Sequence, residues 1–145
     1  MIKKYEDYVC PTCWLPVTKC TCATQPWNLI MIDAPIQRAI KVLNENGLKT
    51  RFCCAGHYRG PDSFVEIQVM FQQKITNAPI GWELDCRKTN IYFDFYPKNK
   101  EEFHTIQEKE IDNLIAWAIG GGNYFPPAIY FSILIFIKLK DSKIG

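Results

Sequence analysis

Four cysteines near the N-terminus form the clearest chemical pattern in this sequence. Two residues separate Cys10 from Cys13, one residue separates Cys20 from Cys22, and all four lie within thirteen residues. Two thiolates in a tight turn can reach one metal ion, and residues i and i+2 of an extended stretch point to the same side. Four thiolates match tetrahedral zinc, with iron as the competing metal and free cysteines or disulfides as non-metal alternatives. We expect a zinc knuckle.

The stretch CPTCWLPVTKCTC resembles the N-terminal zinc motif of the DTW-domain family, Cys-x2-Cys-x2-Pro-x3-Cys-x-Cys. The four cysteines and Pro16 occupy the positions of that pattern. Members of the family transfer an aminocarboxypropyl group from S-adenosylmethionine to RNA, so the resemblance implies a zinc site and makes RNA a candidate partner. The family's Asp-x-Thr-Trp signature is absent from this sequence. The resemblance therefore extends to the metal site and not to the reaction.

A second group of reactive side chains follows a predicted strand at residues 48–54. Its glycines permit a positive φ and a close backbone approach, so exposed amides there could hold an anion. In the strand we expect Phe52 to point into the core, with Arg51 and Cys53 on the opposite surface. The predicted ligand-binding residues are Arg51, Cys53, His57, Tyr58 and Arg59.

Two other interpretations of this second group stay open. The cysteines could be small core residues with structural roles only, since cysteine is commonly buried. Alternatively, a thiol and His57 could form a nucleophilic site, or a second metal site completed by Cys86 or His104.

This segment also resembles the wybutosine-synthesis methyltransferase family, in which a Ser-Ser-Cys-Ser-Gly-Arg turn follows a strand and a Gly-Lys-Trp strand comes later. Here Phe52-Cys53-Cys54-Ala55-Gly56-His57 and Gly81-Trp82 occur in the same order, with His57 in place of the arginine. The segment is similar as well to small uncharacterised proteins of low-GC Gram-positive bacteria and their phages.

Hydrophobic periodicity predicts the elements that position these residues. Asp33 can cap a helix whose apolar stripe is Ile36, Ala39, Ile40 and Leu43, and Gly47 ends it. Alternating or continuous apolar runs predict strands at 48–54, 64–71, 82–86, 91–96 and 128–140, and a second helix at 101–119. The fold class is α+β: a mixed or antiparallel sheet of four to five strands backed by two helices. We expect a zinc-binding knuckle at 1–27 and an α+β domain at 28–145.

Composition restricts the class of protein. The formal charge is only +2, whereas a general nucleic-acid binder is usually more basic. Seven cysteines without a secretory signal argue against a disulfide framework, and the longest apolar run is too short to span a bilayer. These features predict a cytoplasmic protein with no membrane partner, and a homo-oligomer stays open.

Together these patterns favour a zinc-containing protein that binds a small anionic, nucleotide-like or phosphate-bearing ligand without turnover. A phage factor that sequesters nucleotide signals would fit this description. One alternative is an RNA-modifying enzyme that uses S-adenosylmethionine, as the two family resemblances imply. Another is a protein-interaction adaptor built on the zinc knuckle, with Trp14 and Leu15 as its apolar tip.

Overall fold

The computed structural model describes residues 7–22, 28–120, 122 and 135. Along the chain the elements are β1 (Tyr8–Val9), β2 (Ile30–Met31), the 3-10 helix η3 (Ala34–Ile36), α1 (Gln37–Glu45), β3 (Thr50–Cys54), β4 (Val65–Phe71), β5 (Glu83–Leu84), β6 (Asn90–Phe95) and α2 (Lys100–Ile119). The predicted strand at 128–140 lies outside the described residues except for Ile135. Within the described part of the chain, no helix combines the length and apolar character needed to cross a membrane.

Four strands form one antiparallel sheet in the order β3-β4-β6-β5, which confirms the α+β class. The alternation predicted for β4 is present, because Val65, Ile67, Val69 and Phe71 are buried while the residues between them are partly exposed. β5 and β6 are joined by a tight turn in which the Asp85 carboxylate accepts hydrogen bonds from the amides of Thr89 and Asn90. The sheet therefore presents one apolar face to the core.

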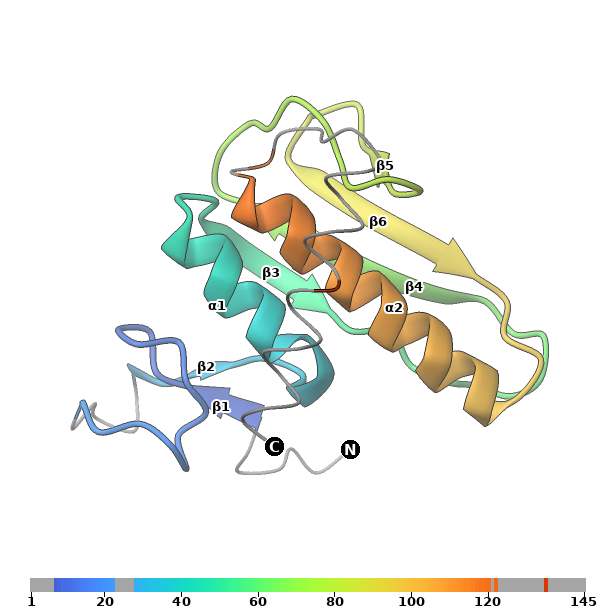
Figure 1. The fold of residues 1–145 in the computed structure, drawn as a ribbon, viewed down its shortest axis with the longest axis horizontal. Helices are drawn as coiled ribbons and strands as arrows, with labels where there is room; N and C mark the ends of the chain where they lie inside the picture. Colours follow the sequence, from blue (N-terminus) through green and yellow to red (C-terminus); the bar gives the residue numbers. More distant parts are fainter. Residues whose placement is uncertain (1–6, 23–27, 121, 123–134, 136–145) are drawn as a thin grey trace.

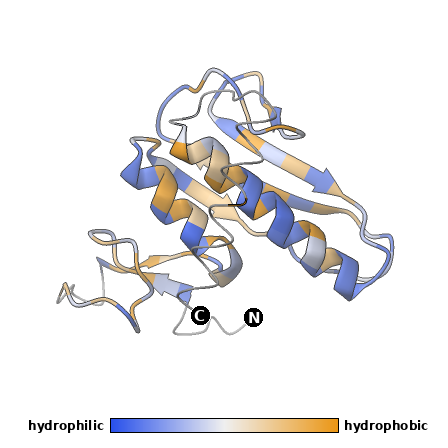
Figure 2. Cartoon of the chain, in the orientation of Figure 1, coloured by the Kyte–Doolittle hydropathy of each residue, from blue (hydrophilic) through white to orange (hydrophobic). Residues whose placement is uncertain are grey.

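Both helices lie side by side across the same face of this sheet (Figure 1). The predicted stripe of α1 is buried, and α2 is hydrophilic in its first half and hydrophobic toward its C-terminal end (Figure 2). An ion pair of 2.5 Å between Arg38 and the buried Asp112 joins the two helices. The side chain of Asn99 caps α2 by accepting the amide of Glu102 at 2.8 Å. The core thus lies between the helix pair and the sheet.

A second, two-stranded sheet connects the cysteine-rich segment to the rest of the fold. Tyr8 pairs with Met31 and Val9 with Ile30 in an antiparallel ladder. Val9 and Ile32 are buried in the main core cluster. The pairing of β1 with β2 therefore attaches the cysteine-rich segment to the part of the chain that follows it.

Asp33 occupies the predicted N-cap position, but its side chain does not cap the helix. It precedes η3 and α1 as expected, but its side chain makes no capping hydrogen bond. The carboxylate instead accepts a hydrogen bond of 3.3 Å from the backbone amide of Ala55, the residue that follows β3. The helix begins through the 3-10 turn and Pro35, which leaves the Asp33 side chain available to the segment after β3.

Candidate functional site

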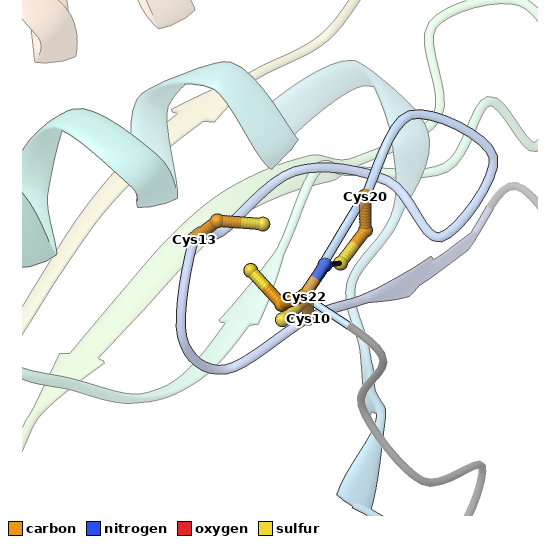
Figure 3. Close-up of side chains that lie close together, drawn as sticks. All are labelled: Cys10, Cys13, Cys20 and Cys22. Atoms are coloured by element: carbon orange, nitrogen blue, oxygen red, sulfur yellow. Dashed lines mark hydrogen bonds between the residues drawn. The ribbon is translucent and has the colours of Figure 1, made fainter.

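The four N-terminal cysteines converge on one point (Figure 3). Each can offer its sulfur, and the four sulfur atoms all lie within 4.8 Å of one another. Four Zn–S bonds of about 2.3 Å in a tetrahedron would place the sulfurs about 3.8 Å apart, which lies within this limit. The structure describes all four cysteines, and none of them forms a disulfide. This cluster can hold a metal ion.

The backbone around the cluster is folded to present these sulfurs. Cys10 donates its amide to Leu15 at 3.0 Å and accepts the amide of Trp14 at 2.8 Å, so the segment closes into a tight turn. The amide of Thr12 points at the sulfur of Cys10, and the amide of Cys22 points at that of Cys20. Such N–H···S contacts stabilise negative charge on sulfur, as in the outer shell of metal–thiolate sites.

The thiols also oppose one another's ionisation. The neighbouring side chains of Cys13 and Cys20, followed by burial, raise the pKa of Cys22 to about 12. Thiolates packed this closely repel one another and need a compensating cation. A bound metal ion provides that charge and deprotonates the thiols that coordinate it. The chemistry of the cluster and its geometry therefore both favour the binding of a metal ion.

A cavity of about 470 Å³ lies beside this unit. Its walls come from the cysteine-rich turn, from β2 and the residues after it, and from β3 with the segment that follows. The lining residues are Trp14, Ile30, Met31, Ile32, Asp33, Thr50, Arg51, Phe52, Cys53, Cys54, His57 and Gln72. The cavity thus combines aromatic surface with charged and titratable groups.

The predicted orientation of Phe52 is wrong. The pairing of β3 with β4 shifts between Thr50 and Phe52, which places a bulge at Arg51. After the bulge Cys53 pairs with the buried Val69 and packs against the core, while Phe52 is 54% exposed. One extra residue reverses the alternation of a strand, so an inward residue becomes an outward one.

Of the five predicted ligand-binding residues, three line the cavity: Arg51, Cys53 and His57. Tyr58 packs its ring 5.7 Å from that of Phe103 on α2, and neither Tyr58 nor Arg59 contributes to the cavity wall. Burial, with smaller contributions from the charges of Asp33 and Cys54, raises the pKa of Cys53 to about 12. Its thiol therefore stays protonated at neutral pH and is no nucleophile.

Asp33 and Cys54 line the cavity but were not among the five predicted ligand-binding residues. One Asp33 oxygen lies 3.8 Å from Nε2 of His57, and ligand atoms of Asp33, Cys54 and His57 lie within 4.8 Å of one another. The sequence suggested Cys86 or His104 as the residue that would complete a second metal site. Among the described residues, the cluster that contains His57 includes neither of them. The helix-capping pattern hid Asp33, because its sequence position fits a cap equally well.

Comparison of the chain with protein-family models, with curated proteins and with solved structures finds no match.

Proposed function

We propose that this is a zinc protein that binds a phosphate-bearing, nucleotide-like ligand in the cavity between the cysteine-rich unit and β3. Zinc suits four cysteine thiolates that converge on one point, and a fully thiolate-ligated ion has a structural role because no coordination position stays open. It would fix the turn that carries Trp14 against the cavity.

The observation that carries the ligand proposal is the composition of the cavity wall. Arg51 offers a planar fork of donors that matches phosphate oxygens, and His57 adds a second donor when protonated. Trp14 and Phe52 offer aromatic faces on which a base can stack. A volume of about 470 Å³ lies within the range of small-molecule sites.

Binding without turnover is part of the same proposal. Its support is the protonated state of Cys53, whose thiol cannot attack a phosphate or acyl group at neutral pH. A protein that retains its ligand in this way would act as a sequestering factor.

Titration calorimetry with a nucleoside diphosphate tests this function. We expect binding by the wild type and an affinity about 10- to 100-fold lower for Arg51→Ala, because a charge-assisted hydrogen bond contributes about 1.5–3 kcal/mol. Arg59→Ala is the matched control, since Arg59 is exposed and lies outside the cavity wall. Equal affinity for Arg51→Ala and wild type would refute the site. Recovery of a modified nucleotide beyond one equivalent per chain would refute sequestration.

A further inference from the structure

We infer that Asp33, Cys54 and His57 form a second metal site, distinct from the four-cysteine cluster, with one coordination position open to the cavity. The three side chains offer a carboxylate oxygen, a sulfur and an imidazole nitrogen within 4.8 Å of one another. All three residues line the cavity. Zinc is the ion that this mixed set of ligands suits best, since it accepts all three donor types.

The distances fit a shared ion better than a direct hydrogen bond. The Asp33 oxygen and Nε2 of His57 are 3.8 Å apart, which is beyond hydrogen-bonding distance. In a tetrahedral site zinc bonds of about 2.0–2.2 Å would place the oxygen and the nitrogen about 3.4 Å apart, so a shift of a few tenths of an ångström would let both atoms bind one ion between them. The separation is therefore compatible with a bridging metal ion.

The same arrangement disfavours a nucleophilic relay of cysteine, histidine and aspartate. A relay uses the two opposite nitrogens of the imidazole ring, so its nucleophile and its carboxylate stand on opposite sides of that ring. Here the sulfur, the carboxylate oxygen and one ring nitrogen are all mutual neighbours. Convergence on one point is the geometry of coordination.

The segment that carries Cys54 and His57 is held in place from three sides. Both peptide groups of Ala55 are engaged: its amide donates to Asp33 at 3.3 Å and its carbonyl accepts Gln107 of α2 at 2.8 Å. Gly56 adopts φ +84°, and a Cβ there would lie 2.8 Å from Cγ1 of Val65. These contacts fix the reversal of the chain that returns His57 toward Asp33.

Cys54 rather than Cys53 supplies the sulfur because, after the bulge in β3, the two adjacent cysteines lie on opposite faces of the strand. Cys53 pairs with the buried Val69 and packs against the core, whereas Cys54 pairs with the partly exposed Gln68 on the other side of the strand. The two adjacent cysteines thus have different roles.

Three protein ligands leave the fourth tetrahedral position of zinc open. Arg51 and Asp33 both line the cavity and carry opposite formal charges. A dication bound by one carboxylate and one thiolate cancels both of those negative charges, so the charge of Arg51 is left uncompensated. The open position would then take an anionic oxygen of the ligand in place of the water that a hydrolytic zinc site activates, a step that rests on the proposed function of binding without turnover.

Metal stoichiometry tests the site independently of any nucleotide. Wild-type protein equilibrated with excess Zn²⁺ and then desalted should hold two ions per chain, and His57→Ala and Asp33→Asn should each hold one. His104→Ala is the control, because His104 is an exposed histidine on α2, and it should keep two. Wild-type protein that holds a single ion would overturn the proposal whether or not the variants fold.

Cobalt substitution identifies the ligands. With Co²⁺ in both sites the sulfur-to-metal charge-transfer absorption should arise from five Co–S bonds, so Cys54→Ala should lose about one fifth of it and Cys53→Ala none. Inorganic phosphate should alter the Co²⁺ spectrum of the wild type and leave that of His57→Ala unchanged. An unaltered wild-type spectrum would overturn the open position. Two bound ions without nucleoside diphosphate binding would keep this site and refute only the ligand proposal.

Discussion

Glu66 of β4 and Asp94 of β6 are direct cross-strand partners, and Glu66 lies between the buried Val65 and Ile67, so the two carboxylates lie side by side on the sheet face opposite the core. Burial, followed by the hydrogen bond and the charge of Asp94, raises the pKa of Glu66 to about 7. Like charges directly opposite each other in a sheet are destabilising. The pair therefore makes stability depend on pH near neutrality.

The sign of this dependence follows from the direction of the shift. The folded state binds the Glu66 proton more tightly than the unfolded state, so the contribution to stability is complete below about pH 4.5 and is lost as the pH rises through 7. We expect Glu66→Gln to be more stable than wild type at pH 8 and to lose that advantage at pH 4. The gain should stay below about 1 kcal/mol, because solvent screens a pair this exposed.

Urea unfolding of wild type and Glu66→Gln across this pH range measures the effect. Glu108→Gln, an exposed carboxylate on α2, is the control and should show no comparable trend. A difference between wild type and Glu66→Gln that does not change with pH would contradict the assignment.

Cys22→Ser should lower the zinc content by one equivalent per chain. The substitution removes one of four converging sulfurs, and three thiolates hold the ion less tightly in a loop that the metal itself orders. Elemental analysis after desalting gives the stoichiometry, and circular dichroism confirms that the four-stranded domain remains. Cys86→Ser, at an exposed cysteine outside both clusters, should leave the zinc content unchanged. Full zinc retention by Cys22→Ser would show that Cys22 is no ligand.

Gly56→Ala should destabilise the protein more than Gly47→Ala does. Both glycines have a φ in the left-handed region, +84° and +83°, but a Cβ at position 47 meets nothing within 4 Å. The backbone alone should cost about 1–2 kcal/mol at either position. The close approach to Val65 should add about 1–3 kcal/mol at position 56. Equal losses in denaturant unfolding would show that the Val65 side chain moves aside freely.

Arg38→Met should destabilise the packing of α1 on α2 by about 1–3 kcal/mol. The substitution leaves the buried carboxylate of Asp112 without its cation, and the half-exposed position of Arg38 keeps the cost below that of a fully buried pair. Lys41→Met is the matched control on the same helix, because the exposed Lys41–Glu45 pair should contribute less than about 0.5 kcal/mol. In a double-mutant cycle Asp112→Asn should recover part of the loss, and additive effects would count against a direct coupling.

The sequence was sufficient to predict the elements whose apolar residues follow a simple period. The buried stripe of α1 and the alternating residues of β4 are where their spacing places them, because one-sided burial imposes that spacing on any amphipathic element. The four N-terminal cysteines were predictable for a similar reason. Their ligand geometry is local, so short spacing alone brings the sulfurs together.

The rest depends on contacts that no local pattern encodes. The bulge at Arg51 follows from the register of β3 against β4, and it reverses the faces of Phe52 and Cys53. The approach of Asp33 to His57 joins residues far apart in the chain through the meeting of β2 and β3 near one cavity. A capping residue and a cavity carboxylate look identical until that tertiary contact is known.

The compactness of the cysteine-rich unit has a consequence for the order in which the protein assembles. Its four sulfurs span thirteen residues, and β2 closes the unit with β1 at Ile30–Met31, so joining these parts costs little loop-closure entropy. The sheet instead needs β3, β4 and β6, which extend to Phe95, before it can pair. During synthesis from the N-terminus the four cysteines can therefore bind a metal ion while most of the sheet is still unmade. The supply of metal ions during synthesis would then determine whether the cysteine-rich unit folds before β3, β4 and β6 are synthesised.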